Sequence, residues 1–454
     1  MKAARSTVFV VAQVLVLIAA MVIPGGCAEP ALDKGGPTLD KGAPTADKGE
    51  PVLDYVARPD AAFSWEVAAR PGDEGSAGAF RLNMTSQVWQ GITWKHRVTV
   101  TSPANPRHPD WCVLMITGGN PAGEMSAFAS LTAGALGCPV AVLGDIPNQP
   151  LFDGLREDAL IAYTFTKYLA TGDASWPLLF PMAKSAVRAM DCLQAFSEKE
   201  WGKRIQRFLV TGASKRGWTT WFTGVVDSRA AAIMPMVYNN LNLPAQMRHQ
   251  REQFGDYSEQ IDDYTKLGLP DLLASAQGQS LGRAVDPYTY RDRTTMPKLI
   301  IAGTNDPYWP VDAAGDYFND LVGPRYLLHL PNSGHGMDDR RKLLAGVWGF
   351  SSAVMGEGSL PKLSWQFATG DQGLTVAATC DPAPVRVLVW KAQAATKDFR
   401  KSKWTSEELA PGGGKISYTL AKPAEGYAAL YLEFVYQSGG RDWPLTSEIH
   451  TVGP

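Results

Sequence analysis

Three side chains that lie far apart in the sequence could together perform nucleophilic catalysis. Ser214 lies in the segment Gly212-Ala213-Ser214-Lys215-Arg216-Gly217, Asp306 follows an apolar run, and His335 is flanked by glycines. A serine hydroxyl is a weak nucleophile at neutral pH, so it needs a histidine to take its proton and an acid to orient that histidine. The sequence therefore predicts Ser214 as nucleophile, His335 as general base and Asp306 as the orienting acid.

Each of these residues also has a simpler interpretation. Ser214 could cap the helix predicted from Lys215 onward, and the second glycine of its segment falls one position later than in the G-x-S-x-G pattern. His335 stands apart from the other histidines, which lack a comparable setting. Asp306 could be a turn acid before Pro307, in which case the substitutes would be Asp312, Asp338 and Asp339.

Apolar runs of strand length precede all three residues. They span residues 207–211 before Ser214, 299–302 before Asp306 and 325–330 before His335. Since the carboxyl ends of parallel strands meet at one edge of a sheet, the three side chains can converge there. The order Ser, Asp, His along the chain is that of the α/β-hydrolase fold.

The wider pattern divides the chain into two folded parts. From 55 to 356, short β-rich runs alternate with longer helical ones, which predicts a mainly parallel sheet with helices on both faces. The expected strands are 96–101, 111–117, 140–143, 207–211, 231–237, 299–302 and 325–330, and the expected helices are 158–170, 182–201, 215–226 and 313–321. From 360 to 454 the helical period disappears, and an antiparallel β-sandwich domain is expected with strands at 374–379, 385–390, 415–420 and 428–436.

Residues near the predicted nucleophile could bind the reacting group and the substrate. The backbone N–H of Lys215 and that of Gly119 or Asn120, after strand 111–117, are the expected oxyanion-hole donors, although the two glycines at 118 and 119 could simply form a turn. Trp218, Tyr308 and Trp309 could line a pocket for a sugar or an apolar acyl group, or belong to the core.

The N-terminus has the order of an export signal. Lys2 and Arg5 precede an apolar run over 8–23, which predicts a signal peptide over 1–26. Cys27 follows small residues and is the expected lipidation site, although Pro24 departs from the lipoprotein pattern and an ordinary signal peptide is the alternative. Residues 27–54 repeat a Gly- and Pro-containing unit and are expected to form a flexible tether. An exported protein of the periplasm or cell envelope, held to the membrane by a lipid anchor, is predicted.

Composition excludes several other functions. A formal net charge of -2 gives no field for attracting nucleic acid. The sequence has no H-E-x-x-H metal motif, phosphate-binding loop or dinucleotide fingerprint, so hydrolysis without a cofactor or metal is expected. Besides Cys27 the cysteines are Cys112, Cys138, Cys192 and Cys380, an even number that permits disulfides without choosing a pairing, and burial as small apolar residues is the alternative.

Several segments around these residues resemble the PhoPQ-activated pathogenicity-related protein family. They are residues 146–151, 157–159, 176–178, 181–191 and 212–218. The resemblance extends from about residue 55 to the C-terminus and implies an exported α/β-hydrolase-like protein. It defines no reaction.

A local resemblance concerns the residue after the serine. Glucuronoyl esterases carry G-C-S-R-x-G, with a cationic residue near the oxyanion, and residues 212–217 match that spacing. The resemblance implies a similar role for Lys215 and an anionic or sugar-linked substrate. Alternatively, Lys215 and Arg216 are solvated residues of a first helical turn.

The predicted function is a serine hydrolase that cleaves an ester or amide, of a small molecule, glycan or peptide, through an acyl-enzyme. The alternative is a catalytically inactive protein of the same fold that acts in binding or signalling toward a host or the cell envelope.

Overall fold

A long central sheet organises the molecule. The computed structural model describes residues 50–454 apart from 75, 77 and 411, so the signal segment, Cys27 and nearly all of the tether lie outside the described residues. The end of the predicted tether is wrong, because residues 51–54 begin a helix, α2 (Pro51–Ala57), in which Val52 is buried in the core. The sheet has 14 strands, of which β4 to β9 run parallel. In spatial order its strands are β1 (Ser64–Ala69), β2 (Phe80–Trp89), β3 (Ile92–Thr101), β5 (Val140–Leu143), β4 (Trp111–Ile116), β6 (Arg207–Ala213), β7 (Ala230–Met236), β8 (Lys298–Gly303), β9 (Arg325–Leu330), β16 (Arg441–Thr446), β15 (Tyr427–Ser438), β12 (Arg386–Ala394) and β13 (Thr405–Leu409), and β17 (His450–Val452) pairs with β15.

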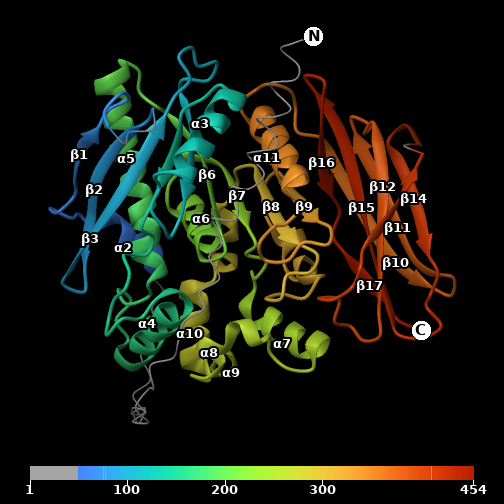
Figure 1. Ribbon diagram of the computed structural model, residues 1–454. Helices are drawn as coiled ribbons and strands as arrows, with labels where there is room; N and C mark the ends of the chain where they lie inside the picture. Colours follow the sequence, from blue (N-terminus) through green and yellow to red (C-terminus); the bar gives the residue numbers. More distant parts are fainter. Residues whose placement is uncertain (1–49, 75, 77, 411) are drawn as a thin grey trace.

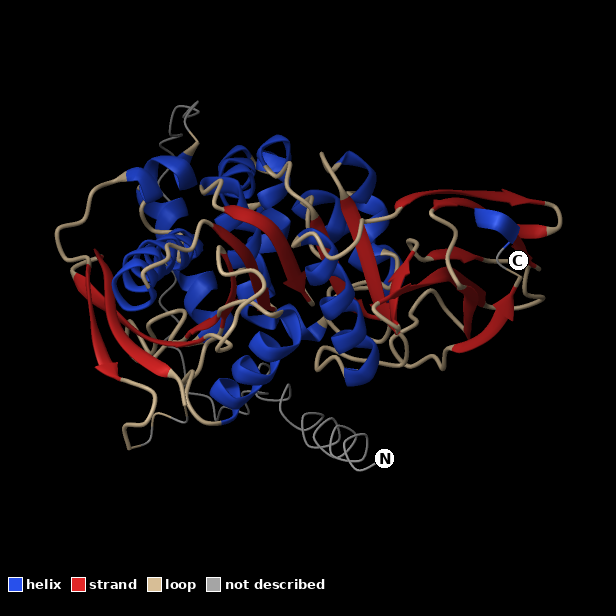
Figure 2. Cartoon of the chain, turned by 90° about the horizontal axis from the view of Figure 1, so that it is seen from above, coloured by secondary structure: helices blue, strands red, loops and turns tan. Residues whose placement is uncertain are grey.

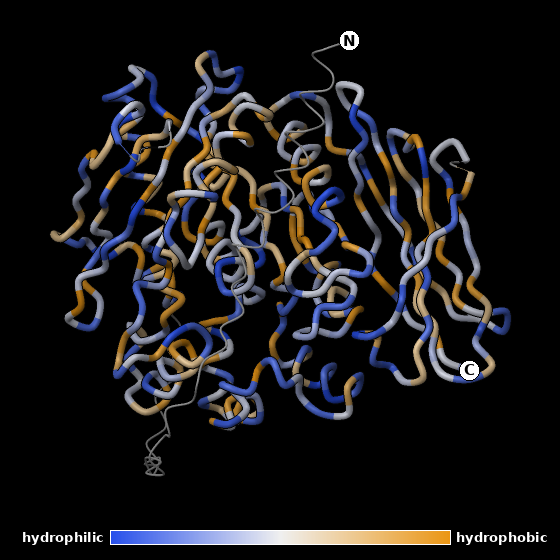
Figure 3. Tube along the Cα trace, viewed as in Figure 1, coloured by the Kyte–Doolittle hydropathy of each residue, from blue (hydrophilic) through white to orange (hydrophobic). Residues whose placement is uncertain are grey.

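Helices cover both faces of the parallel strands (Figures 1 and 2). Every residue of β4 is buried, because its even-numbered side chains enter the core beneath one helical layer and its odd-numbered ones enter the core of the other. A strand buried on both faces must be a continuous apolar run, and Figure 3 shows such runs through the central strands. One layer contains α2 (Pro51–Ala57), α5 (Leu179–Trp201) and α6 (Lys215–Val226), and the other contains α3 (Glu124–Leu136) and α11 (Arg340–Val354).

The predicted fold class is confirmed, with one element wrong. Each strand expected in the sheet is present, and helix 215–226 matches α6. Residues 313–321, expected to form one helix, instead form two 3-10 turns, η4 (Ala313–Asp316) and η5 (Phe318–Asp320). Tyr317 between them has φ -152° and ψ -24°, values outside the helical region that interrupt the helical path.

A group of short helices between β7 and β8 forms a cap at one end of the sheet, next to α4 (Glu157–Thr171) (Figure 1). Sequence patterns did not predict these elements, because most are too short to show a helical period. They are α7 (Leu243–Phe254), η2 (Glu259–Ile261), α8 (Asp262–Thr265), α9 (Leu269–Leu272) and α10 (Ala276–Val285). The next element, η3 (Pro287–Arg293), packs against α6 on the way to β8.

The C-terminal strands form the predicted β-sandwich. A sheet of β10 (Lys362–Gly370), β11 (Gly373–Asp381) and β14 (Lys415–Leu420) packs on β12 and β15, and apolar residues of both sheets share one core. The larger of the two sheets continues into the parallel strands, because β16 pairs with β9 at Thr446 and Leu327. We call residues 360–454 the C-terminal module.

The described part of the chain also bears on disulfides and membrane spans. Cys112, Cys138, Cys192 and Cys380 are all buried and unbridged, and burial raises the pKa of Cys138 to about 12, so its thiol is protonated at neutral pH. Within residues 50–454, no helix has the length and apolarity to span a bilayer.

Candidate active site

Ser214 occupies the turn between β6 and α6. Its backbone has φ 58° and ψ -124°, a region that residues with a side chain rarely adopt. Its side chain makes no capping hydrogen bond within the described residues, although it lies at the N-cap position. The interpretation of Ser214 as a capping residue is therefore not supported, and its strained backbone is typical of a nucleophile elbow.

Two glycines allow this turn to pack closely. A Cβ on Gly212 would lie 2.7 Å from the carbonyl oxygen of Arg216, and a Cβ on Gly217 would lie 2.8 Å from that of Met236. Real Cβ atoms do not approach backbone that closely, so a larger residue would displace α6 from the sheet. The later position of the second glycine, at 217, thus serves helix–sheet packing as the usual pattern does.

Asp306 and His335 form a buried pair at the ends of β8 and β9. His335 Nδ1 lies 2.8 Å from Asp306 Oδ2, and the two side chains are 12% and 4% exposed. The other oxygen of Asp306 accepts the backbone N–H of Tyr308 at 3.0 Å. Since the carboxylate accepts the Nδ1 proton, Nε2 of the neutral ring is left as a base. The alternative acids have other partners: Asp338 accepts from Gly334, Asp339 caps α11, and Asp312 pairs with His249.

The base of this pair has its reactive nitrogen free. His335 Nε2 is buried and has no hydrogen-bond partner among residues 50–454, and no hydrogen bond there joins it to Ser214. The Tyr308 ring packs against the imidazole, with centroids 4.2 Å apart, and also lines the pocket that Ser214 faces. In ligand-free hydrolases the serine–histidine contact is commonly long and shortens when substrate binds.

Backbone donors for an oxyanion lie beside the serine. The N–H of Lys215, in the first turn of α6, has no intrahelical acceptor. Pairing of Ile116 with Gly212 brings the loop after β4 to the same edge of the sheet. In that loop the Gly119 N–H makes only a long 3.5 Å contact with Thr117 Oγ1, and the Asn120 N–H has no partner in the described part of the chain.

Lys215 and Arg216 are neither solvated nor free for a substrate. Lys215 Nζ donates to Asp158 at 2.7 Å, and the Arg216 guanidinium binds both carboxylate oxygens of Glu157, at 2.7 and 2.8 Å. Burial would raise the pKa of Glu157, but the positive charges of Arg216 and Lys215 lower it to about 2. The charges of the two pairs therefore cancel, and the idea that Lys215 attracts an anionic substrate loses its support.

Sequence reasoning missed the acidic half of this cluster. Glu157 and Asp158 belong to one of the segments that resemble the family, which was the available signal. Asp158 also accepts the Tyr264 hydroxyl at 2.9 Å, so the cluster connects α4 to the cap. Arg216 lies against the loop after β4, where a Cβ on Gly118 would be 1.8 Å from its Nη2.

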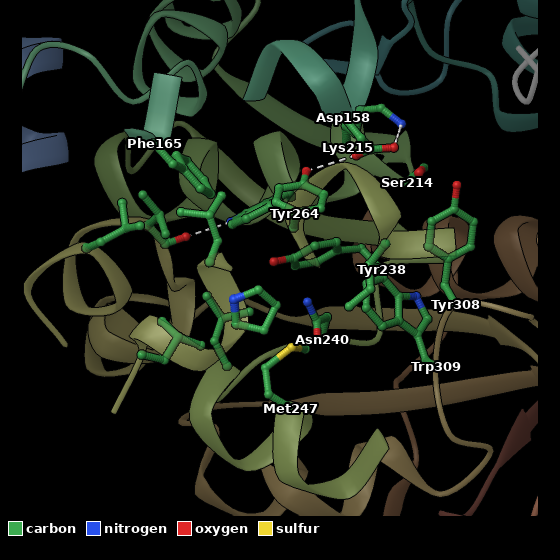
Figure 4. Close-up of a pocket in the computed structure, with 18 residues that line it drawn as sticks. Asp158, Phe165, Ser214, Lys215, Tyr238, Asn240, Met247, Tyr264, Tyr308 and Trp309 are labelled. Carbon is green, nitrogen blue, oxygen red and sulfur yellow. Dashed lines mark hydrogen bonds and ion pairs between the residues drawn. The ribbon is translucent and has the colours of Figure 1, made fainter. Parts of the chain in front are cut away.

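An apolar pocket opens next to Ser214 (Figure 4). The three aromatic residues predicted to line it, Trp218, Tyr308 and Trp309, all do so. Trp218 stacks on Tyr238 with centroids 5.0 Å apart and donates its indole N–H to Val285 O at 2.7 Å. The far wall belongs to the cap and comprises Leu243, Met247, Ile261, Leu269, Pro270, Leu273, Leu281 and Val285. With a volume of about 90 Å³ and few polar atoms, the cavity suits a short apolar group.

Fold and site together define an α/β-hydrolase-fold protein with a serine, an aspartate and a histidine at the expected strand ends. The chain belongs to the PhoPQ-activated pathogenicity-related protein family, whose model matches residues 52–400. It is also 31% identical over 422 residues to the autocrine proliferation repressor protein A of Dictyostelium discoideum, a match that covers 84% of this chain and 85% of that protein.

Solved structures with a related arrangement are more distant. Acetyl xylan esterase 1 from Thermoanaerobacterium sp. JW/SL YS485 has a TM-score of 0.47 at 13% identity, covering 67% of this chain and 91% of that chain. A glucuronoyl esterase from Sporotrichum thermophile has a TM-score of 0.41 at 12% identity, covering 68% and 81%.

Proposed function

We propose that this protein is a serine hydrolase that cleaves an ester or amide of a short apolar acyl group through an acyl-enzyme. The observation that carries the proposal is the buried His335–Asp306 pair, whose free Nε2 accompanies a serine held in a strained elbow. The apolar pocket beside Ser214 supports the choice of an apolar acyl group. The pairing of Lys215 with Asp158 neutralises its charge and argues against an anionic substrate.

Each residue then has a defined role in two half-reactions. Ser214 Oγ bonds to the acyl carbon while its proton passes to His335 Nε2, and the leaving alcohol or amine departs with that proton. Water next gives a proton to Nε2 as its oxygen bonds to the acyl carbon, and the proton returns to Ser214 as the acid leaves. The N–H groups of Lys215 and of Gly119 or Asn120 stabilise the oxyanion in both steps.

Labelling with a fluorophosphonate probe tests the nucleophile. The Ser214 oxygen bonds to phosphorus, fluoride leaves, and His335 takes the proton, so wild-type protein is expected to be labelled and Ser214→Ala to remain unlabelled. Ser275→Ala is the matched control, because Ser275 caps α10 through its side chain and takes no part in catalysis. Undiminished labelling of Ser214→Ala would remove Ser214 from its role.

A second candidate is a non-catalytic binding or signalling protein toward a host or the envelope. The relative named as an autocrine proliferation repressor favours it, together with the missing hydrogen bond between Ser214 and His335. For this candidate neither the wild type nor any serine variant would be labelled. Hydrolysis of short-chain esters, glycan esters and peptides by the wild type but not by Ser214→Ala would reject it.

We also propose that the protein is exported and held at the cell envelope by a lipid on Cys27. The proposal rests on the order of charged, apolar and small residues before Cys27 in the sequence. Metabolic incorporation of a radiolabelled fatty acid is expected for the full chain and absent from Cys27→Ser. Equal incorporation by both proteins, or by neither, would contradict the anchor.

A further inference from the structure

A loop of the C-terminal module contacts the turn that carries the catalytic acid. The loop spans residues 395–404, between β12 and β13. Asn305, which directly precedes Asp306, donates its side-chain amide to the carbonyl oxygens of Arg400 at 3.1 Å and Ser402 at 2.7 Å. The turn after β8 is thereby attached to a segment about 95 residues later in the chain.

The same loop also contacts the turn that carries the catalytic histidine. Asn332 lies three residues before His335 and exchanges two hydrogen bonds with the backbone of Trp404, donating to its carbonyl at 3.0 Å and accepting its N–H at 2.8 Å. The backbone of Asn332 has φ 54°, a left-handed value that asparagine tolerates better than most residues.

The two turns are tied to each other as well. Asn305 N–H donates to Ser333 O at 2.9 Å, and Asn332 N–H donates to Thr304 Oγ1 at 2.9 Å. Gly303 lies so close to the histidine turn that a Cβ there would be 2.3 Å from Ser333 O. Displacement of either turn from loop 395–404 would therefore disturb both members of the Asp306–His335 pair.

Loop 395–404 is itself firmly held. Phe399 and Trp404 are 1% and 2% exposed and pack in a small core with Tyr431. From the same loop, Arg400 reaches the cap, where it pairs with Glu259 at 3.0 Å and lies 4.0 Å from the centroid of the Phe254 ring. The loop therefore joins three parts of the site to the C-terminal module: the acid turn, the histidine turn and the cap.

We propose that loop 395–404 acts as a clamp that positions Asp306 and His335, with Asn305 and Asn332 as its positioning residues. Its kinetic consequence rests on the proposed hydrolase function. Correct alignment of a base with its nucleophile is sensitive to shifts of about 1 Å, which can slow a reaction by about 100-fold. The C-terminal module is thus a part of the catalytic apparatus and not only an appended domain.

The test compares Asn305→Ala and Asn332→Gly with Tyr326→Phe in the full chain. Glycine accepts the φ of Asn332, so that variant removes the hydrogen bonds without backbone strain. Tyr326→Phe is matched, because it deletes one hydrogen bond from β9 to the module, between the Tyr326 hydroxyl and Pro361 O at 3.0 Å, at the end of β9 far from His335. Thermal stability, fluorophosphonate labelling, ester kinetics and the downfield NMR signal of the His335 Nδ1 proton are measured.

Asn305→Ala and Asn332→Gly are expected to label about 10- to 100-fold more slowly, with kcat affected more than KM because neither asparagine lines the pocket. Their Nδ1 proton signal should shift or broaden, while Tyr326→Phe keeps wild-type labelling and signal. Wild-type rates and signals in the two asparagine variants would overturn the clamp. An unlabelled wild type would overturn the proposed function alone, because the NMR signal tests the positioning of His335 without catalysis.

Discussion

At the scale of single residues, the backbone of Ser214 carries the strongest sign of function. A serine with φ 58° and ψ -124° lacks the conformational freedom of glycine, and such strain is maintained only where the surrounding structure enforces it. Here Gly212 and Gly217 allow the neighbouring backbone to pack closely, and the Ser214 N–H donates to the carbonyl oxygen of Met236 at 2.9 Å. Stability has therefore been given up locally to present a hydroxyl group.

Relief of this strain is measurable. Ser214→Gly and Ser214→Ala both remove the hydroxyl, but only glycine adopts the native φ and ψ without a steric penalty. We expect the free energy of unfolding of Ser214→Gly to exceed that of Ser214→Ala by about 1 to 3 kcal/mol. Urea denaturation of the two variants measures the difference, and equal stabilities would mean that the elbow is unstrained.

Sequence could single out Ser214, Asp306 and His335 as candidates because each follows a recognisable strand. The partners of Lys215 and Arg216 were not, because Glu157 and Asp158 lie more than 50 residues earlier and meet them only through the fold. A pattern of local residues indicates where a cation lies along the chain. It does not indicate whether another segment neutralises its charge.

At the scale of elements, a largely buried, charged histidine attaches the cap to the segment around η4. His249 on α7 lies between two carboxylates, 2.9 Å from that of Asp312, which precedes η4, and 2.8 Å from that of Asp316, the last residue of η4. Burial would lower the pKa of His249, but the hydrogen bonds to these carboxylates raise it to about 10 from an ordinary value of 6.5. The protonated ring is therefore stabilised by folding.

This raised pKa predicts a pH-dependent stability. Because the folded-state pKa of His249 exceeds the unfolded one, its contribution is complete below about pH 6.5 and is lost as the pH rises toward 10. We expect the free energy of unfolding of the wild type to exceed that of His249→Gln by a few kcal/mol at pH 6 and by much less at pH 10.

Denaturant unfolding of both proteins across this range measures the difference directly. The two proteins are compared because His450 also interacts with Asp312. Since His450 is present in both proteins, its contribution to the pH dependence is subtracted. If the difference in free energy of unfolding stayed constant between pH 6 and 10, His249 would not be protonated in the folded protein.

The cap also marks a limit of sequence interpretation. Residues 313–321 carry a helical composition but form two 3-10 turns, because Tyr317 between them has φ -152° and ψ -24°, which are not helical. The short helices α8 and α9 have too few residues for a periodic signal. Long elements such as α5 were predictable because their own sequence determines which face is buried.

At the scale of the whole molecule, the sequence pattern changes near residue 360 from alternating strands and helices to strands alone. This change indicates a domain boundary, but the large sheet continues across it. Strands β9 and β16 are more than 100 residues apart, and an edge strand has the same alternating pattern whether or not a partner covers it. The hydrophobic core also continues across this boundary. Helix α11 packs so closely on the C-terminal module that a Cβ on Gly349 would lie 2.2 Å from the Trp443 ring. Sequence can locate a change of architecture without showing that two parts share one core.

This shared core predicts a single cooperative unfolding of residues 50–454. Side chains of β4, α11, β11 and β15 belong to one buried cluster, and Lys342 on α11 donates to Glu433 on β15 at 2.5 Å. Separation of the two parts would expose this cluster and the unpaired edge of β9, so neither part should be stable while the other is unfolded. We expect one calorimetric transition whose van't Hoff and calorimetric enthalpies agree, and a chain ending at residue 356 that aggregates instead of folding. Two resolved transitions would contradict the prediction of a single cooperative unfolding. Loop 395–404 could then leave the site while the α/β part stayed folded, so the clamp would lose its physical basis as well.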